Sequence, residues 1–488
     1  MKNIFTPFFD KSERIGLGMG VSQSPDKNHG MNEQLGTIHF IGIGGIGMSG
    51  IAEVLLNLGY KVSGSDKKKS PITKRLEKLG ARVYYEHEKE NVHGCSVVVF
   101  SAAVPMTNPE IREAKQTKIP VIPRAEMLNE LVRMKKGIGI AGTHGKTTTT
   151  GMLSLVLKEG GFDPTMLIGG VLDSLGSNAH LGHGDYLVFE ACEAYNSIEY
   201  FLPEISVLLN VDKDHMESYN NFDELKQTFR HFLNKVPFYS FCVANIDDDN
   251  VKEILHDLSK KVITFGFSEN ADVSAYGLKF DGMNTKFQVK SFGEELGEFT
   301  LRIPGKHNVM NALSVIATSV AVGVSIDKIK SALSKFVNSE RRFQILYDKD
   351  EILIIDDYAH HPNEIQATLQ AARQISKNDD SRRLVAIFQP HLYSRTQMHF
   401  EEFAQSLKLA DKVFLTPIYP AREKPIPGVT TTLIYDLLKE ESVELECVDD
   451  LADVPDKIMN QIQKGDIVIT LGAGDITKVG HEIVNLLK

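Results

Sequence analysis

The sequence predicts a three-domain α/β protein in which each domain is built on a largely parallel sheet. The chain has 488 residues, which at about 150 residues per domain favours three domains. Short apolar runs alternate with helical segments along most of its length, a pattern that builds doubly wound sheets. Two glycine-rich turns each follow an apolar strand and open a helical segment, an arrangement that binds phosphate groups.

The first unit follows a polar leader. Residues 1–36 are glycine-rich and polar, and they predict a flexible leader without function, in which Met31 is an alternative start. From Thr37 the alternation predicts a Rossmann-like unit with strands at 38–43, 61–63 and 97–101 and helices at 48–58 and 72–79.

The second and third units show the same alternation, without an internal sequence repeat. The second begins at Gly137 with a strand, a glycine turn and an amphipathic segment over 151–159, and continues with strands at 186–190 and 205–210. The third begins near Leu346, with strands predicted at 352–356, 384–388, 412–416 and 466–471.

Composition excludes several classes of protein. A net charge of -10 argues against a nucleic-acid partner, which normally meets a basic face. The four cysteines, Cys95, Cys192, Cys242 and Cys447, lack the spacing of a metal site or a disulfide framework, which fits a reducing compartment. No stretch approaches the roughly 18 apolar residues of a membrane span. We therefore expect a cytoplasmic protein that does not insert into membranes.

The first glycine turn is Gly42-Ile43-Gly44-Gly45-Ile46-Gly47, with Asp66 at the end of the next strand. A glycine turn at a helix N-terminus binds a pyrophosphate and does not by itself select the rest of the ligand. The motif therefore fits a dinucleotide, a nucleotide sugar or a structural tight turn. The Lys67-Lys68-Lys69 run that follows is typical of a solvated surface, and we assign it no role.

The second glycine turn is Gly142-Thr143-His144-Gly145-Lys146-Thr147-Thr148, directly after an apolar strand. Its glycines allow backbone amides to face a polyphosphate, Lys146 can reach the outer oxygens, and Thr147 can offer a hydroxyl to Mg²⁺. The strict phosphate-loop pattern fails because Ile140 stands where a glycine is required. Since strand, turn and helix all fall in place, we expect ATP or GTP here.

Candidate metal and base ligands follow this turn. Glu190 ends one strand and His215 follows the next, so both fall at the sheet edge where α/β folds bind ligands. A carboxylate suits Mg²⁺, whereas a histidine is a less usual ligand and also fits a capping or surface role. Asn308 and Asn311 share one predicted helical face. Their amides can contact a purine or serve capping and packing.

Seven motifs in this order resemble those of the Mur ligases. They lie at 142–147, 190–193, 214–216, 307–311, 341–343, 356–362 and 388–396. The resemblance runs from about Leu35 to the C-terminus. It implies a flexible leader over 1–36, a UDP-sugar-binding Rossmann-like domain over 37–136, a central ATP-binding domain of the phosphate-loop type over 137–342, and a C-terminal Rossmann-like, amino-acid-binding domain over 343–488.

The resemblance also implies an activity. ATP would phosphorylate the lactyl carboxylate of UDP-N-acetylmuramate, and the amine of L-alanine would attack the acyl phosphate to form an amide, in cytoplasmic peptidoglycan precursor synthesis. The implied cofactors are ATP and Mg²⁺. The implied partners are these small-molecule substrates, and we expect a monomer or weak dimer.

Residue roles are carried over from the matched positions. Lys146 would neutralise the transferring phosphoryl group, Thr147 and Glu190 would hold one Mg²⁺, and His215 would hold a second. The implied nucleotide contacts are Gly142, Thr143, His144, Gly145, Lys146, Thr147, Thr148, Asn308 and Asn311 at the adenine, Arg342 and Asp357.

The substrates are assigned in the same way. The resemblance places the UDP pyrophosphate at Gly42, Gly44, Gly45, Ile46 and Gly47, the uridine near Asp66, His87 and Ser101, and the incoming amino acid at His360, His391 and Arg395. Arg395 would face the carboxylate of the amino acid and belongs, with Lys146, Glu190 and His215, to the implied catalytic set.

The chain departs from the family pattern at three places. Cys192-Glu193-Ala194-Tyr195 stands where many relatives have Asp-Glu-Ser-Asp. Leu392 stands where many carry arginine, which questions a double-arginine clamp. Later-acting Mur ligases carry a carbamylated lysine, and we expect Lys226, the nearest lysine after His215, to be unmodified.

Three other functions compete with this interpretation. A recycling ligase would join a whole tripeptide to the same UDP-sugar, but the motifs over 357–362 and 388–396 favour L-alanine addition. A non-catalytic sensor of UDP-sugar and ATP should lack the metal-binding residues, which are present. An NAD dehydrogenase would use the first glycine turn alone.

Overall fold

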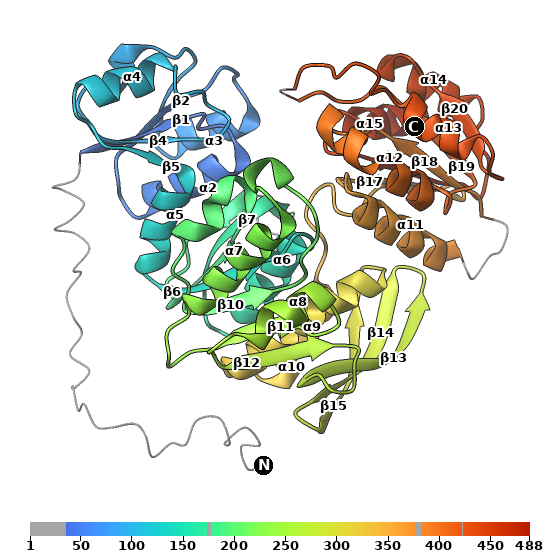
Figure 1. Cartoon of the computed structure of the whole chain (residues 1–488), viewed down its shortest axis with the longest axis horizontal. Helices are drawn as coiled ribbons and strands as arrows, with labels where there is room; N and C mark the ends of the chain where they lie inside the picture. The colour runs from blue at the N-terminus through green and yellow to red at the C-terminus, as the bar shows by residue number, and fades with distance from the viewer. Residues whose placement is uncertain (1–35, 173–176, 377–381, 422) are drawn as a thin grey trace.

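The computed structural model describes residues 36–172, 177–376, 382–421 and 423–488. The predicted leader, with Met31, lies outside the described residues except for Gly36. Three α/β units follow one another along the chain, and Figure 1 shows the first (blue) and the third (orange to red) on either side of one end of the central unit. This arrangement confirms the predicted fold class, while the domain limits within the chain stay predictions.

The first unit is a five-stranded parallel sheet in the order β3-β2-β1-β4-β5. Its strands are β1 (Thr37–Ile41), β2 (Val62–Ser65), β3 (Arg82–Tyr84), β4 (Cys95–Phe100) and β5 (Val121–Pro123). Its helices are α2 (Ile46–Asn57), α3 (Pro71–Lys78), α4 (Pro109–Gln116) and α5 (Arg124–Arg133). The strand order reverses between β1 and β4, the place where doubly wound sheets bind ligands.

The central unit is a ten-stranded mixed sheet in the order β15-β14-β13-β12-β11-β10-β6-β9-β7-β8. Its strands are β6 (Lys136–Ala141), β7 (Thr165–Leu172), β8 (Ser177–His180), β9 (Tyr186–Glu190), β10 (Ile205–Leu208), β11 (Cys242–Asn245), β12 (Val262–Gly266), β13 (Val273–Asp281), β14 (Asn284–Ser291) and β15 (Glu294–Leu301). Tight turns join β13 to β14 and β14 to β15, so these strands pair antiparallel. The sequence analysis did not predict this extension of the parallel sheet.

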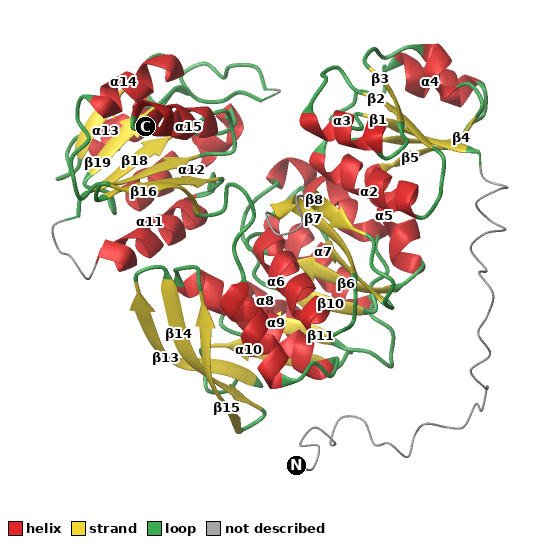
Figure 2. Ribbon diagram, turned by 180° about the vertical axis from the view of Figure 1, so that it is seen from behind, coloured by secondary structure: helices red, strands yellow, loops and turns green. Residues whose placement is uncertain are grey.

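Helices cover both faces of the central sheet (Figure 2). Helices α6 (Lys146–Glu159), α9 (Lys306–Ala321) and α10 (Ile326–Lys335) share one apolar core, whereas α7 (Phe222–Asn234) and α8 (Asp249–His256) belong to the other. Strand β6 contributes Ile138 and Ile140 to the first core. On its other face, a Cβ at Gly139 would meet Phe232 at 2.8 Å and Phe189 at 2.9 Å, so glycine leaves the space that these rings fill.

The third unit is a six-stranded sheet in the order β16-β17-β21-β18-β19-β20, parallel except for β16. Its strands are β16 (Gln344–Lys349), β17 (Ile352–Asp357), β18 (Leu384–Phe388), β19 (Lys412–Leu415), β20 (Glu444–Cys447) and β21 (Ile467–Leu471). Helices α11 (Pro362–Ser376), α12 (Tyr393–Leu407) and α13 (Thr432–Leu438) pack on one face, and α14 (Val454–Met459) and α15 (Thr477–Leu486) on the other.

The predicted elements agree with the structure to within a few residues. The strands at 186–190 and 384–388 have the predicted limits. The helix predicted over 151–159 begins earlier, at Lys146, because the threonine run itself forms its first turn. None of the described helices combines the length and the apolar character that crossing a bilayer requires.

Phe189 offers a test of the central core. It is fully buried on β9 and packs against Phe201, with 5.0 Å between ring centroids. Replacing Phe189 with alanine should destabilise the central unit by about 3–5 kcal/mol, because it removes a large side chain from a closely packed core. Differential scanning calorimetry should show this as a lower transition temperature. The matched control is Phe238→Ala, since Phe238 is 87% exposed; an equal loss in both variants would contradict the packing described here.

Candidate active site

The phosphate loop joins β6 to α6 and requires its glycines. Gly142 has a φ of +134° and Gly145 a φ of +84°, which residues with side chains rarely adopt. A Cβ at Gly145 would also lie 2.5 Å from Asn311 Oδ1, so the loop lies directly against α9. Because α6 begins at Lys146, its free N–H groups open toward the loop and favour an anion there.

Asn210, at the end of β10, holds the loop in place. Its Nδ2 donates to the carbonyl of His144 at 3.0 Å, and its Oδ1 accepts the N–H of His144 at 2.8 Å. This reciprocal pair leaves the backbone of His144 little freedom. The sequence analysis gave Asn210 no role, because the contact joins two loops that are far apart in the chain.

Lys146 is paired with a buried carboxylate. Its Nζ lies 2.9 Å from Glu193 Oε2 and also donates to the carbonyl of Thr143 at 3.0 Å. Burial favours the neutral amine, but the surrounding acidic groups, Glu193 first through its charge and its hydrogen bond and Glu190 after it, together outweigh burial and raise the pKa of Lys146. Lys146 is therefore a cation whose charge is balanced within the protein. Glu193, 1% exposed, is a site residue that the sequence analysis did not assign.

The predicted Mg²⁺ ligands Glu190 and His215 follow the strands on either side of the phosphate loop. Strand β6 lies between β9 and β10, so Glu190 at the end of β9 and His215 beyond β10 flank the phosphate loop. Glu190 Oε1 accepts the N–H of Gly169 at 2.5 Å. His215 has a φ of +55°, and its Nε2 lies 4.0 Å from Asp214 Oδ2. The hydroxyl of Thr147 and the carboxylate of Glu190 are oxygen donors of the kind that Mg²⁺ prefers.

Cys192, the departure in this segment, has a neutral side chain. Burial is the main cause that raises the pKa of its thiol, to about 11. A thiol that stays protonated at neutral pH is a weak ligand for Mg²⁺ and brings no charge to the site. Glu190 and Glu193 are therefore the charged groups of the segment over 190–193.

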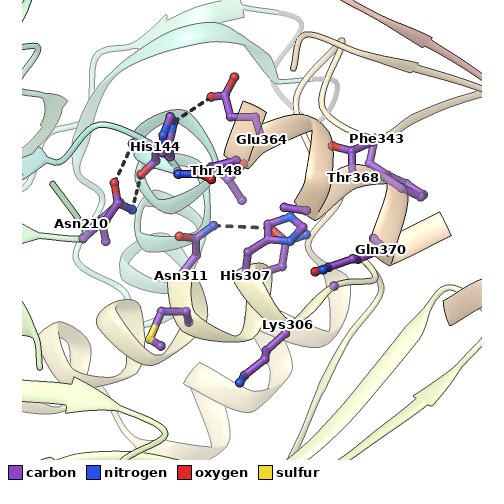
Figure 3. Close-up of a pocket in the computed structure, with 18 of the residues that line it drawn as sticks. His144, Thr148, Asn210, Lys306, His307, Asn311, Phe343, Glu364, Thr368 and Gln370 are labelled. Atoms are coloured by element: carbon purple, nitrogen blue, oxygen red, sulfur yellow. Dashed lines mark hydrogen bonds and ion pairs between the residues drawn. The ribbon is translucent and has the colours of Figure 1, made fainter. Parts of the chain in front are cut away.

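A cavity with a volume of about 620 Å³ opens between the phosphate loop, the start of α9 and helix α11 of the third unit (Figure 3). The predicted nucleotide contacts that line this cavity are His144, Gly145, Thr148, Asn308, Asn311, Arg342 and Asp357. The structure thus brings together residues from four separate motifs. It adds lining residues that no motif indicated, among them Lys306, Phe267 and Gln370.

The two amides at the start of α9 lie in this cavity but already have partners. Asn308 Nδ2 donates to the carbonyl of Pro304 at 2.7 Å, and Asn311 Nδ2 approaches Asn308 Oδ1 at 3.5 Å. The predicted shared face is confirmed. Asn308 also makes the local capping contact that the sequence analysis gave as the alternative to binding a purine. Its contact with adenine therefore stays a prediction.

Asp357 and Arg342 form the far wall of the cavity. The carboxylate of Asp357 accepts the N–H groups of Phe343 and Ala359, both at 2.8 Å. Burial raises the pKa of Asp357 to about 6, although the guanidinium of Arg342 opposes the shift. Arg342 itself lies 3.9 Å from Glu364. Both predicted residues thus reach the cavity from the third unit.

His144 bridges the central and third units. Its Nε2 lies 3.4 Å from Asp212 Oδ2, and its Nδ1 lies 3.2 Å from Glu364 Oε1. Burial opposes protonation of this ring, but the hydrogen bonds and charges of Asp212 and Glu364 outweigh it and raise the pKa of His144 to about 9. At neutral pH His144 is therefore a cation held between two carboxylates.

The residues predicted to hold the incoming amino acid lie together at the same junction. Arg395 Nη2 forms a buried ion pair with Asp214 Oδ1 at 2.6 Å, and Nη1 lies 3.4 Å from His391 Nδ1. The rings of His391 and His360 are 5.9 Å apart. Burial lowers the pKa of His360 to about 3 and that of His391 to about 4, so both are neutral. The partner Asp214 was not predicted.

A second cavity, with a volume of about 570 Å³, lies at the switch point of the first unit. Of the residues predicted to bind the UDP-sugar, Gly42, Asp66 and His87 line it, and so do Lys67 and Lys68, which the sequence analysis left without a role. Ser101 packs against Gly42. Asp66 Oδ2 accepts the N–H of Gly44 at 2.9 Å, so this carboxylate fastens the glycine turn.

Two residues near this cavity were missed by sequence reasoning. Glu110 is fully buried and accepts hydrogen bonds from Ser65 at 2.7 Å and Asn91 at 2.8 Å, and it lies 2.9 Å from His87 Nδ1. It thereby fixes the ring of His87 at the cavity. A Cβ at Gly47 would meet Arg124 Nη1 at 2.6 Å, which places this cation on the glycine turn. Neither residue belongs to a recognisable motif.

Comparisons with known proteins agree with this geometry. The Mur ligase family catalytic domain matches residues 37–136, the Mur ligase middle domain matches 140–319, and the Mur ligase glutamate ligase domain matches 341–474. The chain belongs to the Mur ligase family. Its three matched segments coincide with the three sheets described above.

Individual relatives cover almost the whole chain. The UDP-N-acetylmuramate–L-alanine ligase of Geotalea uraniireducens is 49% identical over 452 residues, 92% of this chain and 98% of the relative. The corresponding ligase of Sulfurihydrogenibium sp. is 48% identical over 450 residues, with 92% and 97% covered. Among solved structures, the UDP-N-acetylmuramate-alanine ligase of Thermotoga maritima has a TM-score of 0.78 at 30% identity, covering 93% and 99%. A murein peptide ligase of Psychrobacter arcticus has a TM-score of 0.68 at 25% identity, covering 93% and 98%.

Lys226 has a local structural role in this Mur ligase. Its Nζ lies 2.9 Å from both Asp223 and Glu253. Two neighbouring carboxylates favour the ammonium form, whereas carbamylation requires the neutral amine. That Lys226 is unmodified stays a prediction, and these ion pairs support it.

The bridge formed by His144 predicts a pH dependence of stability. The pKa of His144 rises from its ordinary 6.5 to about 9 on folding. The stabilisation is therefore fully present below about pH 6.5 and is lost as the pH rises toward 9. The melting temperatures of wild type and His144→Gln are measured with a chelator present. The excess of the wild-type melting temperature over that of the variant should be largest below pH 6.5 and should disappear near pH 9. His256→Gln, which changes an 85% exposed side chain, is the control; a difference that is independent of pH would contradict the bridge.

Proposed function

We propose that this Mur ligase joins L-alanine to the lactyl carboxylate of UDP-N-acetylmuramate, with ATP hydrolysed to ADP and phosphate. The observation that carries the proposal is the cavity between the central and third units, where the phosphate loop, Asn308, Asn311 and Asp357 meet. The cavity at Gly42 and the cluster around Arg395 supply separate places for a nucleotide sugar and for an amino acid. The names and full-length similarity of the relatives support the choice of substrates.

The first step activates a poor acylating agent. The carboxylate oxygen of the sugar's lactyl group attacks the γ-phosphorus, the bond to the β-bridging oxygen breaks, and ADP leaves. Lys146 is placed to balance the charge that spreads over the phosphoryl oxygens. Thr147 and Glu190 would hold one Mg²⁺ and His215 would hold a second, and the two ions would screen the negative charges of the phosphates and the carboxylate.

The second step forms the amide. The neutral amine of L-alanine attacks the acyl carbon, the bond from that carbon to the phosphate oxygen breaks, and the nitrogen gives up one proton to the leaving phosphate. Arg395 binds the carboxylate of L-alanine, which replaces Asp214 as the partner of the guanidinium group. His360 Nδ1 donates to the carbonyl of Tyr358 at 2.9 Å, so in this tautomer Nε2 keeps a lone pair that can accept a hydrogen bond from the amine.

Product analysis tests the proposal directly. The full chain is incubated with UDP-N-acetylmuramate, ATP and Mg²⁺, and with L-alanine, glycine, L-serine or a murein tripeptide in separate reactions, and the products are identified by mass spectrometry. We expect an ATP-dependent product that contains L-alanine. Ligation of the tripeptide alone would identify a recycling ligase, and absence of ADP release with every acceptor would identify a non-catalytic binding protein.

Lys146 should be essential for phosphoryl transfer. Lys146→Ala removes a preorganised charge from the developing anion, and kcat should fall by at least about a hundredfold. ADP release and phosphate release report the effect. Lys136→Ala is the matched control, because Lys136 begins β6 at the end away from the phosphate loop and is 48% exposed. Near-normal ADP release by Lys146→Ala would remove the lysine from the mechanism.

Arg395 should act on L-alanine and not on activation. Loss of one charge-assisted hydrogen bond, worth about 1.5–3 kcal/mol, should raise KM for L-alanine roughly 10- to 150-fold in Arg395→Ala. The amount of acyl phosphate that can be trapped from Arg395→Ala should remain near that of the wild type. Leu392→Arg in this background should recover part of the affinity, because it supplies the arginine that many relatives carry.

Asp214→Asn separates this role from a purely structural one. The asparagine keeps the shape of the partner but removes the charge that competes with the L-alanine carboxylate. KM for L-alanine should therefore not rise in Asp214→Asn. An equal rise in Asp214→Asn and Arg395→Ala would mean that the ion pair supports the fold and that the carboxylate binds elsewhere.

A further inference from the structure

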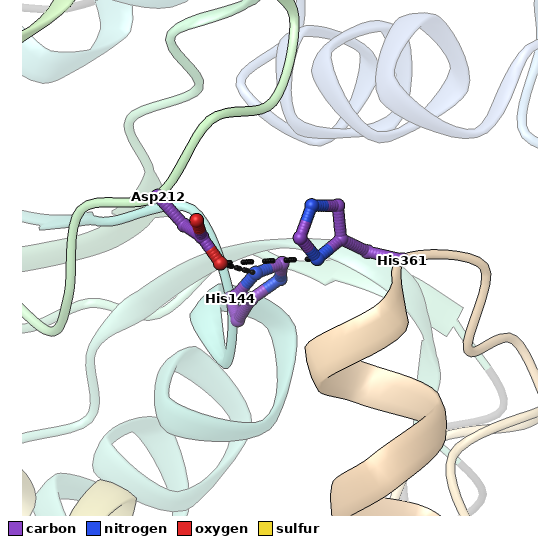
Figure 4. A group of neighbouring side chains, drawn as sticks. All are labelled: His144, Asp212 and His361. Carbon is purple, nitrogen blue, oxygen red and sulfur yellow. Dashed lines mark hydrogen bonds and ion pairs between the residues drawn. The ribbon is translucent and has the colours of Figure 1, made fainter. Parts of the chain in front are cut away.

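A histidine, an aspartate and a second histidine meet where the phosphate loop touches the third unit (Figure 4). His144 Nε2 lies 3.4 Å and His361 Nδ1 lies 3.8 Å from the same oxygen, Asp212 Oδ2. All three potential ligand atoms lie within 4.8 Å of one another. His144 and Asp212 belong to the central unit, and His361 is the residue directly before α11 in the third unit. The cluster does not include Thr147, Glu190 or His215.

His361 is the unusual member of this cluster. It is 3% exposed, and among the described residues neither of its ring nitrogens has a hydrogen-bond partner. Leaving a buried polar group without a partner is unfavourable, and such groups in native proteins call for an explanation. Its Nδ1 points toward Asp212 in Figure 4, at a separation too long for a hydrogen bond but suited to two ligands of one ion.

We propose that His144, Asp212 and His361 bind a divalent transition-metal ion of the Zn²⁺ class. Bonds of about 2.0–2.1 Å in a tetrahedral site place two ligand atoms about 3.3 Å apart. The distances of 3.4 and 3.8 Å are close to this value, so small side-chain movements complete the set. His144 and Asp212 also line the nucleotide cavity, so a fourth ligand could come from that side.

The surroundings of the cluster favour a cation. Glu364 Oε1 lies 3.2 Å from His144 Nδ1, the ring nitrogen that faces away from Asp212. A carboxylate on the far nitrogen of a histidine ligand is the usual second contact at protein zinc sites, because it fixes the ring and increases its basicity. When the ion binds, the proton of His144 leaves to solvent, and the charge of the ion takes its place between Asp212 and Glu364.

Two imidazoles and one carboxylate select against Mg²⁺. Mg²⁺ prefers oxygen ligands in an octahedron, whereas Zn²⁺, Co²⁺ and Ni²⁺ accept imidazole readily. The site is therefore chemically distinct from the set proposed to hold Mg²⁺. Its occupation would join the phosphate loop to the third unit and withdraw His144 and Asp212 from the nucleotide cavity. The expected consequence is inhibition of turnover by Zn²⁺ that excess Mg²⁺ does not relieve.

Metal binding is tested on the chelator-treated full chain without substrates, so the outcome is independent of the proposed ligase activity. Zn²⁺ affinity is measured by calorimetry with excess Mg²⁺ present, and Co²⁺ reports its ligands by its absorption spectrum. We expect one high-affinity ion per chain and no thiolate charge-transfer band. His361→Gln and Asp212→Asn should each weaken binding at least about tenfold, the lower end of what loss of a supporting contact costs.

Asn363→Ala provides the discriminating variant. Its Nδ2 donates to Asp212 Oδ2, the oxygen assigned to the ion. If the cluster is only a hydrogen-bonded junction, Asn363→Ala and Asp212→Asn both loosen it in the same way. If it is a metal site, Asn363→Ala frees the oxygen and leaves Zn²⁺ affinity equal or higher. His256→Gln, an 85% exposed histidine, is the control for surface binding.

The outcomes decide between the alternatives. Unchanged affinity in both His361→Gln and Asp212→Asn, or a thiolate band with Co²⁺, would overturn the proposal in favour of a cysteine or surface site. Thermal unfolding without metal shows whether each variant is folded. Should His361→Gln fail to fold, His144→Gln, which changes a side chain that is 18% exposed, gives the same decision.

Discussion

Charge balance in the absence of substrate is the constraint on which this active site depends. A buried cation without a partner costs several kcal/mol, so a site that must receive three anionic groups cannot leave its cations alone. Lys146 is paired with Glu193, Arg395 with Asp214, and His144 with both Asp212 and Glu364. In each case a carboxylate of the protein occupies a place that a phosphate or carboxylate of a substrate would take. The affinity for a substrate then depends on the difference in free energy between the ion pair with the substrate and the ion pair within the protein.

Two of these pairs cross from the central to the third unit, so groups proposed to bind substrates also join the two units. Asp214 belongs to the central unit and Arg395 to α12, and Glu364 of α11 reaches His144 in the phosphate loop. In the proposed mechanism, an L-alanine carboxylate that takes over Arg395 would release Asp214 beside His215. A nucleotide that changes the position of His144 would alter its contact with Glu364. Each substrate would thereby change the free energy of the contact between the two units, which is the physical content of coupling between sites.

Local patterns predicted the parts of the site that lie within one strand-turn-helix unit. The phosphate loop is such a part, because a strand, two glycines in unusual conformations and a helix start are all encoded within a dozen residues. The same is true of the glycine turn at Gly42 and of the shared face of Asn308 and Asn311. The family resemblance added the predicted placing of Arg342, Asp357 and Arg395, which local spacing alone does not indicate.

The charge partners could not be predicted, because they are contacts between distant parts of the chain. His144 and Glu364 are 220 residues apart in sequence, and Asp214 and Arg395 are 181 apart. Glu110 lies on α4 at a position that looks like an ordinary charged helix residue, and only the packed sheet brings Ser65, His87 and Asn91 to it. The antiparallel strands β13 to β15 were not predicted for a different reason: only β14 alternates regularly between buried and less buried side chains, and the region contains no motif.

Cys192 shows how charge balance limits the sequence of this site. Its thiol is neutral, because burial raises the pKa to about 11. Lys146 therefore meets one fully buried charged neighbour, Glu193, whereas the family pattern has aspartates at 192 and 195. The segment thus carries two negative charges fewer than that pattern, and Glu193 is the carboxylate that balances Lys146. Since Glu193 is engaged by the lysine, Glu190 is the carboxylate of this segment that the proposed mechanism leaves for Mg²⁺. The neutral cysteine thus accompanies one carboxylate that pairs with the lysine and one that is left for the proposed metal ion.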